Sequence, residues 1–300
     1  MDTGKMSSVS GRVILPDPAR VFLDRSKRFV SLSEGHALAD WLLFLGRLTE
    51  VQHNLLGGSP QDTSLIGKDF TDGGNRHLPL FPAVSHLHDF ALKDAVARFA
   101  DETIPFAPSP ARRTLERLRV MSEADLNGLA DRLVRIQFEG TDKDTLPFIG
   151  AVLQVRWTMV ASKSGLEGTG LPSISVTCPS CGYLPGSAIV RTDGDVSGLR
   201  YLHCALCNTE WHLVRATCTG CKESDRVSYL HVDGGTPAVR AEVCDSCGGY
   251  LKIMYQEKSA AVDPIADDLA SLALDLLVDE AGYNRLGPNL LLIPGGNAVS

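Results

Sequence analysis

Four CxxC pairs between residues 178 and 247 decide the fold of this chain. They read CPSC at 178–181, CALC at 204–207, CTGC at 218–221 and CDSC at 244–247. These pairs use all 8 cysteines of the 300-residue chain, and none precedes residue 178. Disulfides and redox pairs are possible for such cysteines, but four pairs with none left over favour sites in which four thiolates hold one metal ion.

An internal repeat with an offset of 40 residues shows which pairs belong together. Thr177-Cys178 matches Thr217-Cys218, and Arg200 matches Arg240. Each unit reads CxxC, 22 intervening residues, CxxC, which is close to the spacing of four-cysteine zinc sites. We therefore predict two metal ions, each held by the four cysteines of one unit. The first set is Cys178, Cys181, Cys204 and Cys207, and the second is Cys218, Cys221, Cys244 and Cys247.

The residues between the pairs of each unit indicate a hairpin. Short apolar segments flank Asp193-Gly194 in the first unit and Asp233-Gly234 in the second, and both dipeptides favour tight turns. A hairpin brings its two ends together, so both CxxC turns would meet at one ion. Such a small module gains much of its folding free energy from the ion.

The residue after each CxxC pair is expected to adopt a left-handed backbone, so that amide groups can point at the sulfurs. Gly182, Asn208 and Gly248 suit that conformation, whereas Lys222 does not. The turn that ends at Lys222 is therefore predicted to be the loosest of the four.

The residues leave iron and zinc open, because a tetrahedron of thiolates suits either ion. Residues 171–258 carry about equal numbers of acidic and basic side chains, and four thiolates outweigh the charge of one ion. The whole chain has a formal net charge of -7. Zinc ribbons that bind nucleic acids use basic faces, so this charge disfavours nucleic acid as the partner.

Before the cysteines, apolar residues recur at helical spacing. Helices are predicted at residues 34–56, 84–100, 110–119, 123–136 and 147–161, with Ser31 or Ser33 capping the first. Residues 57–82 are expected to form a long loop and residues 162–172 a linker. After the cysteines, residues 264–281 read as a helix that packs back on the others.

The predicted fold class is α+β and multidomain: an N-terminal all-helical bundle, two tandem rubredoxin-like or zinc-ribbon modules, and a C-terminal helix. The predicted divisions are a disordered tail at 1–19, a helical domain at 20–165, ribbons at 173–214 and 215–258, and a C-terminal helix and tail at 259–300.

No catalytic constellation is recognisable, which predicts a protein that is not an enzyme. The N-terminus lacks the apolar run of a secretory signal, and no stretch is apolar enough to span a membrane. These features predict a cytoplasmic protein with no membrane insertion. His203 and His212 could be alternative ligands, although the cysteines already fill two sites. Trp211 could anchor a partner or fill the core of the ribbon, and the sequence leaves both open.

Three stretches resemble the family of formate dehydrogenase accessory proteins, FdhE. They are CPSCG at 178–182, GLRYLHCALCNTEWH at 198–212 and GYNRLGPNLLLIPG at 282–295. The N-terminal segment with Glu34-Gly35-His36 and Trp41 is similar as well. Lys222 departs from the family's pattern, which has glycine there.

This resemblance implies a cytoplasmic accessory protein that takes part in protein maturation, as a chaperone does. It would bind the catalytic subunit of a respiratory formate dehydrogenase before export and be needed for its activity. It implies iron in rubredoxin-like sites on the eight cysteines, with zinc possible. The alternatives are a rubredoxin-like electron carrier and, less favoured, a nucleic-acid-binding zinc ribbon.

Overall fold

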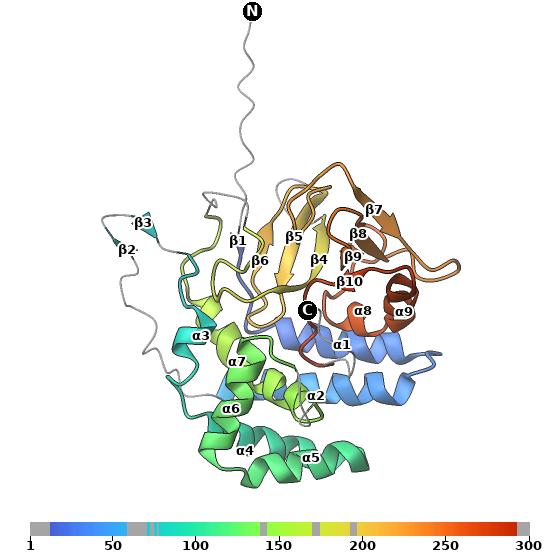
Figure 1. Cartoon of the computed structure of the whole chain (residues 1–300). Coiled ribbons are helices and arrows are strands. Elements are labelled where there is room, and N and C mark those ends of the chain that lie inside the picture. Colours follow the sequence, from blue (N-terminus) through green and yellow to red (C-terminus); the bar gives the residue numbers. More distant parts are fainter. Residues whose placement is uncertain are drawn as a thin grey trace, which may run out of the picture.

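Helices form most of the chain before residue 163, and the regular elements described from residue 185 to residue 255 are strands (Figure 1). The computed structural model describes residues 13–58, 71–72, 75–76, 78–138, 143–169, 175–192 and 197–292. The predicted α+β class, with helices first, two four-cysteine ribbons next and helices again near the C-terminus, is confirmed.

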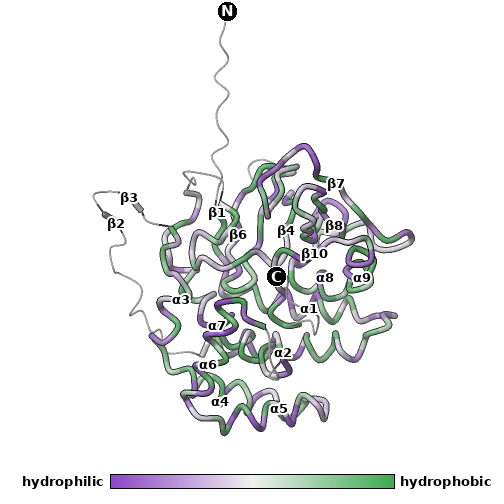
Figure 2. Tube along the Cα trace, viewed as in Figure 1, coloured by the Kyte–Doolittle hydropathy of each residue, from purple (hydrophilic) through white to green (hydrophobic). Residues whose placement is uncertain are grey.

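The helical part contains helices of four to 20 residues. They are α1 (Val21–Ser33), α2 (Ala39–Gly58), α3 (Ala83–His86), α4 (Leu92–Thr103), α5 (Ser109–Val120), α6 (Glu123–Val134) and α7 (Leu146–Ser162), with a 3-10 turn, η1 (Ile104–Phe106). Figure 2 shows hydrophobic and hydrophilic stretches alternating along these helices, as expected when one face of each is buried.

Helix α7 is the central element of the helical part. It begins with Pro147 in its first turn, where the missing backbone N–H is not needed. Its own apolar residues lie around the whole circumference of the helix, and nearly every residue of the helix is buried, including Trp157. A helix that is apolar all round must be covered on all sides. The bundle covers one side of α7, and the first cysteine unit covers another.

The predicted helix at 34–56 is wrong at its start, and the cap assigned to Ser31 or Ser33 is wrong with it. Ser33 is the last residue of α1, and its hydroxyl donates to the Val30 carbonyl. Gly35 then takes a φ of +68°, a conformation that ends helices. His36 Nδ1 accepts from the Leu38 backbone N–H at 3.0 Å just before α2 begins.

The predicted helices at 110–119, 123–136 and 147–161 correspond to α5, α6 and α7, whereas the helix predicted at 84–100 is split into α3 and α4. Most of the loop predicted at 57–82 and the end of the linker predicted at 162–172 lie outside the described residues.

Among the described residues, all but two of the strands join one sheet of eight, in the order β1-β6-β5-β4-β9-β8-β7 with β10 paired to β9. Its strands are β1 (Val13–Ile14), β4 (Pro185–Arg191), β5 (Leu199–Cys204), β6 (Glu210–His212), β7 (Val227–Leu230), β8 (Val239–Cys244), β9 (Gly249–Tyr255) and β10 (Asn284–Arg285). The remaining strands, β2 (Thr71–Asp72) and β3 (Asn75–Arg76), pair with each other.

The two cysteine units are fused through the middle of this sheet. Each unit forms an antiparallel meander, β4-β5-β6 in the first and β7-β8-β9 in the second. Strand β4 then pairs in parallel with β9, so that Ala188 lies beside Ile253. The predicted hairpin strands correspond to β4 with β5 and β7 with β8. The turn expected at Asp193-Gly194 lies outside the described residues.

The tail predicted at 1–19 is wrong at its C-terminal end. Val13 is fully buried and pairs with Trp211, so β1 completes the edge of the sheet. Residues 1–12 lie outside the described part of the chain. The helix predicted at 264–281 is broken into α8 (Ala266–Leu269) and α9 (Leu272–Glu280). The remaining domain divisions stay a prediction. One apolar core is shared by the helices and the first cysteine unit.

Within the described ranges, no helix combines the length and the apolar character that crossing a membrane requires.

Candidate metal centres

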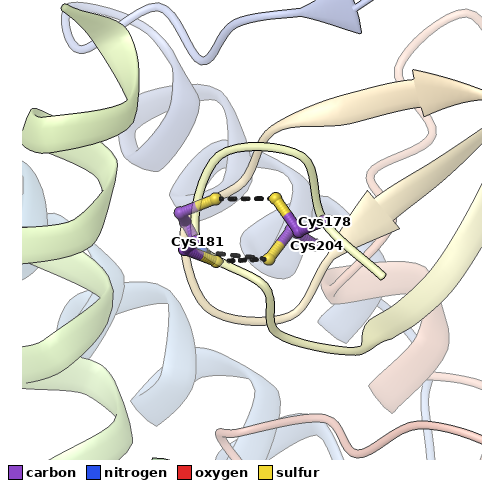
Figure 3. Close-up of side chains that lie close together, drawn as sticks. Cys178, Cys181 and Cys204 are labelled. Carbon is purple, nitrogen blue, oxygen red and sulfur yellow. Dashed lines mark hydrogen bonds between the residues drawn. The ribbon is translucent and has the colours of Figure 1, made fainter. Parts of the chain in front are cut away.

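The first group of cysteines lies where the ends of the first unit meet. Cys178 Sγ lies 3.4 Å from Cys207 Sγ, and Cys181 Sγ lies 3.5 Å from Cys204 Sγ (Figure 3). All four thiols are buried. The predicted set is therefore brought together.

The second group repeats this arrangement in the second unit. Cys218 Sγ lies 3.6 Å from Cys247 Sγ, and Cys221 Sγ lies 3.7 Å from Cys244 Sγ. Cys218 and Cys244 are buried, whereas Cys221 and Cys247 are exposed. In each group the four sulfurs lie within 4.8 Å of one another, and no histidine belongs to either group among the described residues.

Local backbone bonds shape the cysteine turns. The N–H of the first cysteine donates to the carbonyl five residues later, as in Cys178 to Tyr183 at 2.9 Å and Cys218 to Glu223 at 2.7 Å. The residue after each pair has a positive φ, as the sequence predicted. The values are +77° for Gly182, +59° for Asn208, +66° for Lys222 and +66° for Gly248. Lys222 therefore adopts a conformation that costs a side chain roughly 1–2 kcal/mol.

The helical part holds the first cysteine turn through three backbone bonds. Leu80 N–H donates to the Pro179 carbonyl at 3.0 Å, Phe81 N–H to Ser180 at 2.8 Å and Ala83 N–H to Cys181 at 2.9 Å. These bonds satisfy carbonyl groups that are buried away from water. The segment before α3 thus fixes the backbone of one pair of ligands.

Helices α1 and α7 hold the second turn of the first unit. Gln154 donates to the Ala205 carbonyl at 2.8 Å, and the Asn208 amide donates to the Thr158 hydroxyl at 2.8 Å. Arg25 of α1 donates to the side-chain amide oxygen Oδ1 of Asn208 at 2.9 Å. The first site is therefore built partly by residues far away in the sequence.

Residues 284–286 of the C-terminal segment pack against the second site. The Leu286 side chain lies so close to Gly249 that a Cβ there would come within 2.5 Å of it, and a Cβ at Gly220 would come within 2.9 Å. Asn284 N–H also donates to the Gly248 carbonyl at 2.7 Å. Glycine is needed at these positions for the close approach of the Leu286 side chain.

The sulfur geometry fits a tetrahedral ion in both sites. Four sulfurs at about 2.3 Å from one ion lie about 3.8 Å apart, close to the spacings observed. Burial raises the pKa of Cys181 and Cys204 well above the usual range. Burial also raises the pKa of Cys178, but hydrogen bonds from the neighbouring cysteines outweigh burial and lower this pKa well below the usual range. One thiolate disfavours a second beside it, so a cation is required for four.

His203 and His212, the alternative ligands weighed from the sequence, lie outside both groups. Burial lowers the pKa of His203 to about 4, which leaves the ring neutral at pH 7. Burial also lowers the pKa of His212, whose ring packs edge-on against Tyr201.

Trp211 is not a surface anchor. Its side chain is fully buried, and its indole N–H donates to the Ser175 carbonyl at 2.9 Å. Of the two interpretations left open by the sequence, core filling is the one that the structure supports. The neighbouring Glu210 is buried and paired with Arg191.

A groove of about 980 Å³, which the sequence did not reveal, runs between α1 and the first cysteine unit. Charged residues of α1, strands β5 and β6, and residues 256–264 line it. Arg25 lies at its base, fully buried and bonded to Asp263 at 3.0 Å. Arg25 Nη1 and His203 Nδ1 are buried without a hydrogen-bond partner in the described part of the chain.

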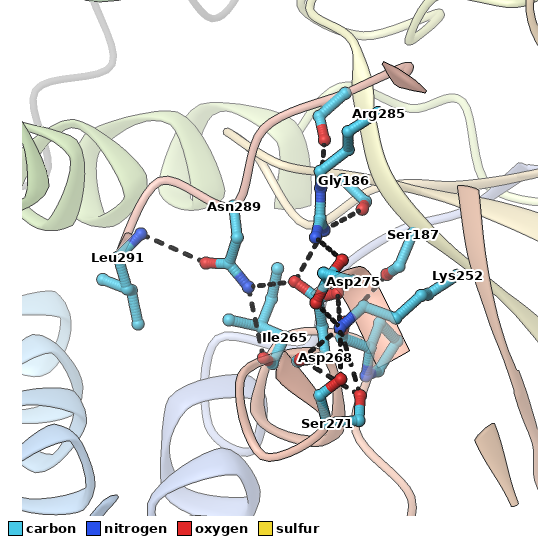
Figure 4. A network of polar contacts seen from close by, with 12 residues as sticks. Gly186, Ser187, Lys252, Ile265, Asp268, Ser271, Asp275, Arg285, Asn289 and Leu291 are labelled. Carbon is cyan, nitrogen blue, oxygen red and sulfur yellow. Dashed lines mark hydrogen bonds and ion pairs between the residues drawn. The ribbon is translucent and has the colours of Figure 1, made fainter. Parts of the chain in front are cut away.

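A buried polar network holds the C-terminal segment to the sheet (Figure 4). Lys252 of β9 is fully buried and pairs with Asp268 at 3.0 Å and with Asp275. Arg285 of β10 pairs with the same two carboxylates at 2.7 and 2.8 Å. No local sequence pattern predicts this network, because its charged residues lie in separate elements.

A helical part fused to paired ribbons, each closed by four cysteines, defines a protein with two tetrathiolate-type metal-binding sites. Three family models match the chain: "FdhE, N-terminal" at residues 11–168, "FdhE, central domain" at 177–215 and "FdhE, C-terminal domain" at 216–292. The chain belongs to the FdhE family, as the resemblance in its sequence indicated.

Relatives of known sequence and structure match over nearly the full length. The "Protein FdhE homolog" of Pseudomonas aeruginosa is 38% identical over 295 residues, covering 94% of this chain and 93% of the relative. "Protein FdhE" of Salmonella enteritidis is 36% identical over 288 residues, covering 94% and 91%. The crystal structure of the FdhE protein from Pseudomonas aeruginosa is similar with a TM-score of 0.81 at 35% identity, covering 95% of this chain and 99% of that one.

Proposed function

We propose that this protein is a non-enzymatic, cytoplasmic accessory factor that binds the catalytic subunit of a respiratory formate dehydrogenase and is needed for its activity. The observation that carries the proposal is the pair of four-cysteine groups in a chain of the FdhE family. As metal ligands we propose all eight cysteines, with iron favoured by the family resemblance and zinc possible.

The metals would act by fixing the shape of the ribbons. In each site, four metal–sulfur bonds would join two CxxC turns. In the first site the cysteines whose sulfurs lie closest together are 29 residues apart in the sequence (Cys178 and Cys207) and 23 residues apart (Cys181 and Cys204). The first site lies against α1 and α7, so an ion there would also fix the floor of the groove through Asn208 and Arg25. The function of both sites in this proposal is to present a preformed surface.

The groove is where we place the partner. It lies where the ribbons meet the helices, and its base contains polar groups that have no partner within the described residues. Buried donors of this kind lose free energy unless something bonds to them. The exposed Arg20 and Lys27 at the rim of the groove would donate hydrogen bonds to carbonyl or carboxylate oxygens of a bound protein segment.

The test is formate dehydrogenase activity in cells that lack the endogenous accessory protein, together with capture of the catalytic subunit by tagged protein. Replacing Arg20 and Lys27, two exposed residues on the rim of the groove, by glutamate should reduce both readouts. Lys93→Glu, on the exposed face of α4, is the matched control and should leave both unchanged. Full capture by the rim variant would place the partner elsewhere, and lack of capture by the unmodified protein would refute the proposal.

The second candidate is a small electron carrier. The exposure of Cys221 and Cys247 favours it, because an electron can enter an exposed site more easily than a buried one. A visible spectrum of anaerobically purified protein tests it, since a ferric tetrathiolate is red and zinc is colourless. A colourless protein with two zinc ions would exclude it.

A further inference from the structure

The two cysteine sites differ in how far solvent reaches them. In the first site all four thiols are 2% exposed or less. In the second site Cys221 and Cys247 are exposed, although the two sites are repeats of one sequence unit. A metal ion in the first site would have no open side, whereas one in the second would be reachable at two of its four sulfurs.

The surroundings of the sites explain this difference. Residues 178–181 and 204–211 are buried without exception, because helices and the segment before α3 cover them. Residues 220–226 and 245–247 are exposed without exception. The C-terminal segment contacts the second site at Gly220, Gly248 and Gly249, and the Tyr283 hydroxyl donates to Asp245. These contacts leave Cys221 and Cys247 exposed.

A pair of hydroxyl groups also closes the first site. The Ser180 and Thr209 hydroxyls lie 3.1 Å apart, and the Thr209 hydroxyl lies 3.2 Å from Cys207 Sγ. The residues 40 positions further on are Gly220 and Gly249, which have no side chain to offer. The second site therefore has no hydroxyl groups at these positions.

We propose that the second site is the exchangeable one, where a metal ion enters and leaves through Cys221 and Cys247, while the first site holds its ion permanently. The proposal rests on the proposed function insofar as both groups bind metal. The class of incoming ligand is a thiolate or another soft chelating group. As an incoming thiol forms its bond to the ion, one cysteine's bond breaks and that cysteine takes up the proton released. No oxidation state changes.

Metal release from the full-length, zinc-loaded protein tests this. An excess of a chromogenic zinc chelator should remove one ion at least about tenfold faster than the other, because local opening energies differ widely within one protein. Cys221→Ser should remove the fast phase. Its repeat equivalent, Cys181→Ser, should remove the slow phase and leave the fast one. Release of both ions at one rate, or a fast phase that survives in Cys221→Ser, would overturn the proposal.

Alkylation of the unmodified protein keeps the proposal falsifiable if Cys181→Ser fails to fold. Iodoacetamide added with the chelator should label Cys221 and Cys247 before any cysteine of the first site, as read by peptide mass spectrometry. Earlier labelling of Cys178 or Cys204 would overturn the assignment. Failure of the protein to bind two ions would instead refute the proposed function, so the two failures are distinguishable.

Discussion

Arg200 of the first cysteine unit donates to the carboxylate of Glu242 in the second at 2.6 Å, with both side chains buried. Arg200 also donates to the Thr217 carbonyl at 3.0 Å and to the Thr219 hydroxyl at 2.8 Å, on either side of Cys218. A strand of the first unit therefore positions a cysteine turn of the second. Burial raises the pKa of Glu242, and the opposing effect of the Arg200 charge only partly offsets this rise.

Arg200→Ala should destabilise the protein by about 3–5 kcal/mol, because it leaves Glu242 buried without its charge partner. Occupancy of the second site should fall as well, since the turn around Cys218 loses its support. Urea unfolding and metal analysis measure the two effects. Arg240, the repeat equivalent, lies over the Tyr255 ring at 5.4 Å. Arg240→Ala is the control and should cost about 1 kcal/mol, so equal losses in the two variants would contradict the assigned role.

Lys222→Gly should stabilise the protein by about 1 kcal/mol, because it removes the cost of a side chain at a φ of +66°. Thermal unfolding of the metal-loaded protein measures this. Asn208→Gly is the matched control at the other non-glycine turn. It should destabilise by about 1–3 kcal/mol, because Asn208 also bonds to Arg25 and Thr158 in the interior. A stabilised Asn208→Gly would show that backbone strain outweighs those bonds.

Trp211→Ala should destabilise the protein by about 3–5 kcal/mol, because it removes a fully buried indole. Chemical unfolding gives the magnitude, and metal analysis should show reduced retention in the first site. Val214→Ala, at a side chain that is 56% exposed, should stay within about 0.5 kcal/mol. A Trp211→Ala protein of unchanged stability would mean that the indole does not fill the core.

Asp268→Asn should destabilise the protein at neutral pH, because Lys252 and Arg285 lose a shared carboxylate. Burial opposes ionisation of Asp268, but Arg285 and Lys252 lower its pKa below the usual value. The stabilising contribution of that carboxylate is therefore present above about pH 4 and is lost as the pH falls through the lowered pKa. Unfolding measured from pH 6 to acid should show a flatter decline in the variant, and parallel curves would contradict this role.

Chelation of both ions should leave most of the far-ultraviolet helical signal, because the helices pack on one another through their own apolar stripes. The remaining structure should melt at a lower temperature, since α7 loses the contact of Gln154 with Ala205. Circular dichroism before and after chelation measures both. Loss of the whole helical signal would show that the helical part is not an independent domain.

The sequence was sufficient where the determining interactions are local. Each cysteine turn and the sign of φ at Gly182, Asn208 and Gly248 follow from a few neighbouring residues. Helix α1 was missed for the opposite reason. Its buried face includes Arg25, which is tolerated in the interior only because Asp263 and Asn208 come from distant elements.

By itself, the sequence determined that there are two four-cysteine units and which cysteines belong to each, because a hairpin of 22 residues joins its own ends. Only the tertiary structure decided that β4 and β9 fuse the units, with Ala188 beside Ile253. It also decided which unit is covered. Pairing and burial of this kind depend on contacts between residues far apart in the sequence. The two copies of one motif therefore differ in how far their cysteines are exposed to solvent.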